Sequence, residues 1–304
     1  MPRHLLVLLL LALLAPRAWA DGVVHLILSE SGQAYQEASE AFRAGLVTGR
    51  TVRVFSLSDL TGGQIQALTR GGDLVVPIGV KAARQVAENH AGQGSVLALM
   101  IPRAVGEKLA WPAGLGRKKA SFAYIDQPVS RSLGLIAEAF PSSSRVGVVI
   151  SPENAGLAKS LQQEASRRQW TLNLESVNTA DEVAGALRRV LADSDVLLLV
   201  PDALVINAAN AQNVLLTTYR YRVPVVGFSQ GLTKAGAVAS LYSSPAQIGR
   251  QGAQMAARWL ETGELPPPQP AAEFSLSVNR HVARSLGVAS PHEAELRRKL
   301  GATE

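Results

Sequence analysis

The segment Gly227-Phe228-Ser229-Gln230-Gly231 has the Gly-x-Ser-x-Gly spacing that exposes a nucleophilic serine on a sharp turn after a strand. His281 and His292 follow it in the chain order of a serine hydrolase. Glycine is common enough that such a string arises by chance in roughly one chain in ten. No His-Gly-Gly run supplies an oxyanion hole. Hydrolysis through Ser229 is therefore the less favoured alternative, and we predict no catalytic residue.

Other catalytic chemistry has little support in the sequence. His25, His90, His281 and His292 lie far apart, without carboxylates at metal-binding spacing. No Gly-x-Gly-x-x-Gly follows an apolar run, and there is no Walker loop. We predict that the protein is not an enzyme and needs neither a metal nor a cofactor.

Polar or small residues follow several apolar runs, at the places where predicted strands end. In open parallel sheets, ligands bind beyond the carboxyl ends of the strands, and the N-termini of the following helices favour anions. Lys81 would add positive charge there, whereas Asp126 could hold an ammonium group. Each of these residues could instead be an ordinary helix cap. The predicted ligand-binding residues are Ser29, Glu30, Ser31, Gly79, Val80, Lys81, Asp126, Ser151, Asp202, Phe228 and Ser229.

The elements that position these residues alternate between strands and helices. The apolar runs are rich in Val, Ile and Leu without strict alternation, as expected of strands covered on both faces. Helix-period segments separate them, which predicts parallel sheets in an α/β fold. A helix over Arg280–Leu286, a capping box of Thr179 with Glu182, and an Asn154 cap are also expected. The predicted strands are Val24–Leu28, Val52–Phe55, Leu74–Ile78, Val96–Ile101, Val146–Ile150, Val196–Val200, Val223–Phe228 and Phe274–Val278.

The first twenty residues predict export. The leucine-rich run Leu5–Ala15 is too short to span a bilayer comfortably, and Ala18-Trp19-Ala20 fits a signal-peptidase site. Residues 1–20 are thus predicted to be a cleaved signal peptide, with Asp21 first in the mature chain. The chain has no cysteine, so it has no disulfide and no lipid-attachment cysteine. This combination predicts an unlipidated protein of a bacterial periplasm.

Charge and composition argue against nucleic acid as a partner. The net charge of +6 includes Arg3 and Arg17 of the leader, and the remaining basic residues occur in short, scattered clusters. Aromatic residues make up only 5% of the chain, which offers few platforms for base stacking.

Several segments resemble one known family. They are Ile78-Gly79-Val80-Lys81-Ala82-Ala83, Gly236-Ala237-Val238-Ala239-Ser240-Leu241, Ile248-Gly249-Arg250-Gln251-Gly252-Ala253, Trp259-Leu260-Glu261-Thr262-Gly263 and Ser277-Val278-Asn279. With the strand order, they resemble the type I periplasmic binding proteins, in the ABC-transporter substrate-binding group that includes receptors for tryptophan and other aromatic amino acids. Gly79-Val80-Lys81 stands where members usually carry a Gly-Thr-Pro-type loop.

The resemblance implies two Rossmann-like lobes with parallel sheets, crossed three times by the chain, that close over a solute. Lobe 1 would comprise residues 21–127 and about 243–263, and lobe 2 residues 128–242 and about 270–289, with 290–304 as a C-terminal tail. The function implied is a monomeric solute-binding protein of an ABC uptake system, with a membrane permease as partner. A binding fold repurposed as a sensor or envelope accessory is the alternative.

Overall fold

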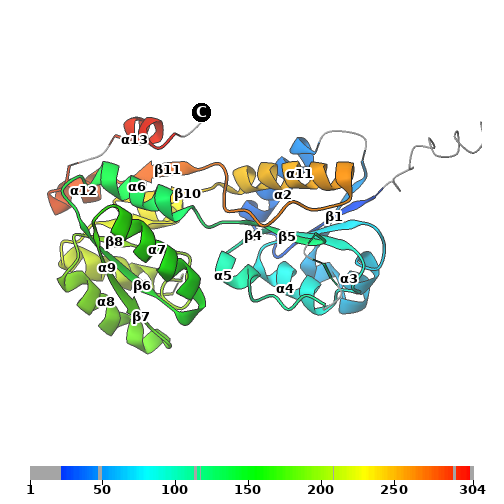
Figure 1. The fold of residues 1–304 in the computed structure, drawn as a ribbon, viewed down its shortest axis with the longest axis horizontal. Helices are drawn as coiled ribbons and strands as arrows, with labels where there is room; N and C mark the ends of the chain where they lie inside the picture. Colours follow the sequence, from blue (N-terminus) through cyan, green and yellow to red (C-terminus); the bar gives the residue numbers. More distant parts are fainter. Residues whose placement is uncertain are drawn as a thin grey trace, which may run out of the picture.

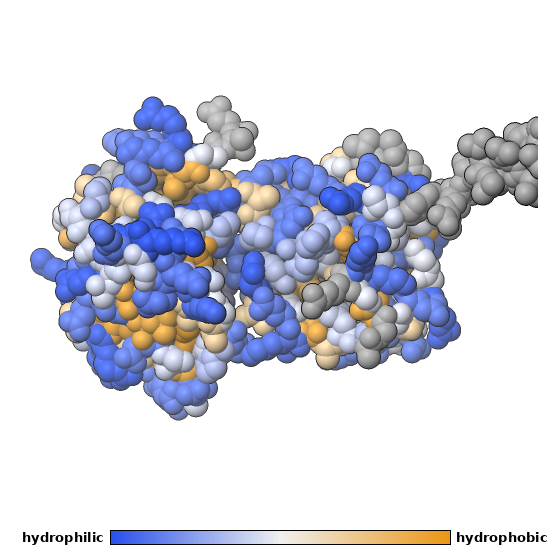
Figure 2. Space-filling view, viewed as in Figure 1, coloured by the Kyte–Doolittle hydropathy of each residue, from blue (hydrophilic) through white to orange (hydrophobic). Residues whose placement is uncertain are grey.

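The computed structural model describes residues 22–46, 50–112, 115–116, 118–207, 209–289 and 292–301. The predicted signal peptide lies outside these residues. The described chain forms two α/β bodies, each built on one sheet, which we call the first and the second lobe (Figure 1). The outline of the molecule narrows where the lobes meet (Figure 2). No helix among the described residues has both the length and the apolar character needed to cross a bilayer.

The first lobe has a parallel five-stranded sheet in the order β2-β1-β3-β4-β5. Alternate strand residues reach opposite faces: Leu26 packs with α2 and α11, whereas Ile27 packs with α3 and α4. The elements are β1 (Val24–Leu28), α2 (Gln33–Gly45), β2 (Val52–Ser56), η1 (Leu57–Asp59), α3 (Gly62–Leu68), β3 (Leu74–Ile78), α4 (Val80–Glu88), β4 (Ser95–Ile101), α5 (Arg103–Gly106), β5 (Ala120–Tyr124) and α11 (Pro245–Thr262).

The second lobe has a six-stranded sheet in the order β11-β10-β9-β8-β6-β7, in which β11 alone is antiparallel to its neighbour. Val148 packs with α6 and α7 on one face, and Val149 packs with α8 on the other. The elements are α6 (Val129–Ala139), β6 (Arg145–Ile150), η2 (Pro152–Asn154), α7 (Ala155–Arg167), β7 (Thr171–Ser176), η3 (Ala180–Glu182), α8 (Val183–Ala192), β8 (Val196–Leu198), α9 (Ala211–Arg220), β9 (Val225–Gly227), α10 (Gln230–Ala235), β10 (Ala239–Tyr242), β11 (Ser275–Val278), α12 (Arg280–Leu286) and α13 (Glu293–Lys299).

These sheets confirm the predicted α/β class with two mostly parallel sheets. Every predicted strand is present, with ends displaced by no more than two residues, and α12 has the predicted bounds. Two predicted caps are wrong. The Thr179 side chain makes no capping hydrogen bond, and Glu182 accepts the backbone N–H of Asn178 at 2.8 Å instead of that of Thr179. The Asn154 amide is turned away from its helix and donates to Asp202 at 2.8 Å.

The chain passes between the lobes three times, at residues 125–128, 243–244 and 270–274. Hydrogen bonds tie these connections together. Gln127 Nε2 donates to Ser243 Oγ at 2.8 Å, and Ser243 Oγ donates to the carbonyl of Glu273. Arg131 donates to Gln127 Oε1 and to the carbonyl of Ala271. The three connections therefore form one joined hinge region.

Candidate ligand-binding site

A cavity of about 340 Å³ lies where the two lobes face each other beside the hinge region. Its volume falls within the range of small-molecule sites. We call it the cleft cavity. One wall comes from α5 of the first lobe and the opposite wall from η2 and α7 of the second. Its lining includes Arg103, Ala104, Glu107, Asp126, Gln127, Pro128, Val129, Glu153, Asn154, Gly156, Leu157, Ser160 and Pro270.

The α5 wall follows a distorted strand end. Met100 in β4 has φ of +57°, a conformation rare outside glycine, and the β4–β5 register shifts between Leu99 and Ile101. Pro102 then begins the short helix, which places Arg103 and Glu107 against the cavity. Arg103 Nη1 lies 4.0 Å from Glu107 Oε1, so these two charges largely offset each other.

Asp126 supplies a carboxylate at the hinge. Its Oδ2 accepts the backbone N–H of Arg103 at 2.7 Å, while no other described residue donates a hydrogen bond to Oδ1. Burial raises the pKa of the Asp126 carboxyl, and the N–H and charge of Arg103 oppose that rise. A donor on a bound solute, above all an ammonium group, would lower the cost of keeping this carboxylate charged.

The opposite wall adds a third carboxylate. It also supplies the one ion pair that joins the two lobes within the described chain. Lys108 Nζ lies 3.2 Å from Glu153 Oε1, and both side chains are more than half exposed. Glu107, Asp126 and Glu153 thus line a cavity in which Arg103 is the only lining cation among the described residues. The balance of charge favours a solute with a cationic or hydrogen-donating group.

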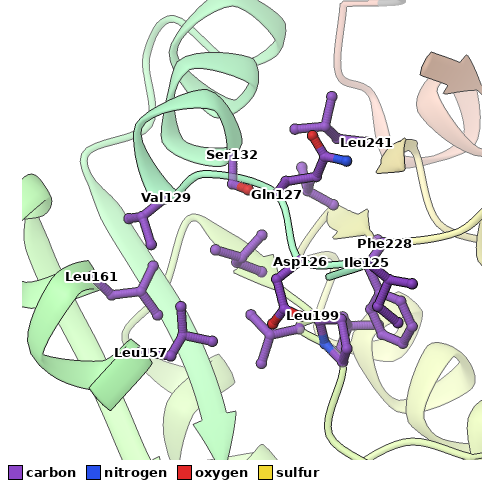
Figure 3. Close-up of a pocket in the computed structure, with 15 residues that line it drawn as sticks. Ile125, Asp126, Gln127, Val129, Ser132, Leu157, Leu161, Leu199, Phe228 and Leu241 are labelled. Atoms are coloured by element: carbon purple, nitrogen blue, oxygen red, sulfur yellow. The ribbon is translucent and has the colours of Figure 1, made fainter. Parts of the chain in front are cut away.

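A much smaller cavity, of about 40 Å³, adjoins the same hinge (Figure 3). Asp126, Gln127, Val129 and Leu157 line both cavities. Phe228 and Leu199 make much of the remaining wall of the smaller cavity apolar. It has room for about one or two water molecules, so it extends the cleft cavity rather than holding a solute itself.

The predicted first-lobe residues gather around the start of α4, where Ser29, Glu30 and Lys81 already have partners within the lobe. Ser29 Oγ accepts the N–H of Ala82 at 2.9 Å, and Lys81 Nζ pairs with Glu30 Oε1 at 2.6 Å. Gly79 has φ of +97° and is buried against Ser29, while Ser31 is exposed. No hydrogen bond of the described chain uses the N–H groups of Val80 and Lys81. These two N–H groups can therefore still donate hydrogen bonds to a bound anion.

The predicted second-lobe residues mostly organise the chain. Asp202 is buried and accepts from the N–H groups of Ser151, Leu204 and Val205 and from the Asn154 amide. It therefore fixes η2 against the end of β8 rather than offering free acceptors to a solute. Phe228 packs in the apolar core and lines the smaller cavity.

Ser229 is the N-cap of α10, where its Oγ accepts the N–H of Leu232 at 3.2 Å. None of the four histidines in the described chain is hydrogen-bonded to it. His281 and His292 contact Arg284 and Arg280 instead. Within the described residues, no cluster of three His, Asp or Glu side chains is suited to a metal.

Of the predicted residues, Asp126 lines both cavities and Phe228 lines the smaller one; the others form separate groups at the strand ends of each lobe. Within the described chain, no hydrogen bond or ion pair links the first-lobe group to the second-lobe group. The sequence analysis missed Arg103, Glu107 and Glu153. A usable signal existed: Arg103 lies two residues after the end of β4, and Glu153 lies two residues after Ser151.

Comparison with solved structures shows the type I periplasmic binding protein fold. A conserved domain protein from Vibrio cholerae is 22% identical, with TM-score 0.65 over 93% of this chain and 100% of that one. An ABC domain from Streptococcus pneumonia in complex with L-Trp is 16% identical, with TM-score 0.65 over 93% and 99%. A ligand-free, open substrate binding protein with adhesive properties from Clostridium difficile is 17% identical, with TM-score 0.67 over 89% and 96%.

Sequence comparison identifies the family. No curated protein matches the chain. The sequence model of one family, described as ABC transporter substrate binding protein, matches residues 58–297, which is most of the chain. The chain therefore belongs to the family of ABC transporter substrate binding proteins.

Proposed function

We propose that this protein is a periplasmic receptor that binds a small, amino-acid-like solute between its lobes and presents it to an ABC permease. The observation that carries the proposal is the placement of Asp126, whose carboxylate lines a cavity of about 340 Å³ beside all three lobe connections. The family supports a small-molecule ligand and a membrane permease as partner. The leader pattern of residues 1–20 supports the periplasm.

The chemistry of the cleft supports a zwitterionic solute. An ammonium group would find Asp126 together with the carboxylates of Glu107 and Glu153. A carboxylate on the solute would need donors outside this lining, and the free N–H groups of Val80 and Lys81 at the start of α4 are the candidates. Lys81 contributes little to this anion site, because Glu30 already neutralises it.

Binding would work through hinge closure. A solute held by one lobe gains contacts with the other only in the closed state, so it shifts the population toward that state. The closed shape is what a permease would distinguish from the empty receptor.

The test is a thermal unfolding screen of amino acids, small amines and small carboxylates. At a hundredfold excess over its Kd, a cognate solute stabilises the folded state by about 2.7 kcal/mol. We expect an upward Tm shift for at least one solute that carries an ammonium group. Asp126→Asn should weaken its binding at least tenfold, because the variant removes the charge and keeps the shape.

Asp181→Asn is the matched control, since Asp181 is exposed on η3 and lines neither hinge cavity. Equal losses in both variants would remove Asp126 from the site. If a broad screen finds no stabilising solute and none is carried through native purification, the transport function is rejected in favour of a sensor or accessory role.

A further inference from the structure

The first lobe contains a second and larger cavity, of about 1010 Å³. We call it the lobe-1 cavity. It shares only Arg103 and Glu107 with the lining of the cleft cavity, so α5 stands between the two. Its other walls come from residues 109–111, from β5, and from the C-terminal part of α11 with the segment 264–268 that follows it. None of these residues belongs to the second lobe.

An aromatic wall lines this cavity. Phe122 and Tyr124 are two residues apart on β5 and therefore share one face of the strand. Their rings stack with centroids 5.4 Å apart and planes within 9° of parallel. The ring of Trp111 lies 6.1 Å from that of Phe122 and continues the wall. Leu109, Leu265 and the run Pro266–Pro268 complete an apolar lining large enough for a polycyclic or long-chain body.

The wall also carries a hydrogen-bond donor without a partner. The indole N–H of Trp111 is buried and has no hydrogen-bond partner within the described chain. Burial also raises the pKa of the Tyr124 phenol to about 12, so its hydroxyl keeps its proton at neutral pH. A buried N–H without a partner is unfavourable, and a ligand oxygen at this position would remove that cost.

The charges at the cavity leave one cation unpaired. Lys118 Nζ pairs with Glu264 Oε1 at 2.8 Å, and Arg103 faces Glu107 at 4.0 Å. Arg258, exposed on α11, has no hydrogen bond or ion pair of its guanidinium within the described chain. The lining therefore has a net charge of about +1, which suits one negative group. A cationic ligand is disfavoured, because the Arg103 guanidinium already lies over the Tyr124 ring, 5.3 Å from its centroid.

We propose that the lobe-1 cavity is a second ligand site, which binds an amphiphilic monoanion with its flat apolar body against Trp111, Phe122 and Tyr124 and its anionic group at Arg258. This proposal does not rest on solute binding in the cleft.

The test uses two fluorescent probes that differ in one group. Anilinonaphthalene sulfonate carries an aromatic body and one negative charge, and N-phenyl-1-naphthylamine has the same body without the charge. Both should bind the folded protein with a rise in fluorescence, the anion more tightly at low salt. Arg258→Gln should weaken the anionic probe about tenfold and leave the neutral probe within twofold. Trp111→Ala should weaken both probes by similar factors.

Two controls make the result specific. Arg220→Gln removes an exposed arginine of the second lobe, and Asp126→Asn alters the cleft; neither should change the binding of either probe. Arg258 is exposed, so its variant should unfold at the temperature of the parent protein. The proposal is wrong if Arg258→Gln leaves the anionic probe unchanged, if Arg220→Gln weakens it equally, or if Asp126→Asn abolishes it.

Discussion

Gly79 joins β3 to α4 and determines how closely the first strand ends approach each other. Its φ is +97°, and a Cβ built on it would lie 2.6 Å from both Ser29 Oγ and Tyr35 Cε1. Ser29 Oγ in turn caps the N–H of Ala82. A glycine here therefore keeps the start of α4 in place, with the N–H groups of Val80 and Lys81 free.

Gly79→Ala should destabilise the protein by about 3 kcal/mol, through backbone strain together with the clash against Ser29 and Tyr35. Gly92→Ala is the matched control, because Gly92 has φ of +85° but no atom within 4 Å of the added carbon. It should cost about 1 kcal/mol, from strain alone. Urea unfolding of both variants checks the difference; equal losses would show that the contact with Ser29 and Tyr35 contributes nothing.

Residue types at strand ends could be predicted from the sequence, but their tasks could not. Ser29, Asp202 and Ser229 lie where ligand-binding residues were expected, yet each uses its side-chain oxygen to accept backbone N–H groups. Helix caps and ligand contacts use the same small polar residues. Only the direction of the side chain in the folded protein distinguishes one role from the other. Asp126 could be identified because it lies two residues after the end of β5, in the first of the three connections between the lobes.

Among the elements of the second lobe, the C-terminal helix α13 is packed firmly against its neighbours. It contacts β11 and α6, and Leu296 is 3% exposed within the core of the second lobe. Lys299 pairs with Glu138 of α6 at 2.9 Å. This helix thus covers the edge of the sheet formed by the antiparallel strand β11.

Leu296→Ala should lower the free energy of unfolding by about 2–3 kcal/mol, because it removes buried methyl groups and leaves a cavity. Leu216→Ala on α9 is the control, since Leu216 is 48% exposed. It should change stability by less than about 0.5 kcal/mol. Chemical denaturation followed by circular dichroism distinguishes the two; a neutral Leu296→Ala would mean that α13 does not stabilise the second lobe.

The strands that the sequence did not predict, β5, β7 and β10, escaped for different physical reasons. β5 and β7 are edge strands, and β7 alternates polar with apolar residues instead of forming an apolar run. β10 is four residues long and includes Ser240. The buried central strands were visible because both of their faces must be apolar. The α5 wall escaped prediction for a different reason: it depends on the distortion at Met100, which leaves no pattern of apolar residues.

At the scale of the whole molecule, the lobes meet through two kinds of contact. The hinge region joins them by three chain connections that are hydrogen-bonded through Gln127, Ser243 and Glu273. Away from the hinge, Lys108 of the first lobe pairs with Glu153 of the second. The first contact can persist as the lobes move, whereas the second requires them to be close. The ion pair therefore favours the closed arrangement, in which the proposed solute would be held.

Lys108→Glu should place two like charges across the cleft and weaken solute binding about two- to fivefold at low salt, as expected for an exposed ion pair. Lys108→Arg keeps the positive charge opposite Glu153 and should bind the solute as the parent protein does. Small-angle scattering should show a larger radius of gyration for Lys108→Glu at subsaturating solute, and added salt should reduce the difference. A Lys108→Glu variant that binds normally, or a Lys108→Arg variant that is equally impaired, would show that this pair does not bias closure.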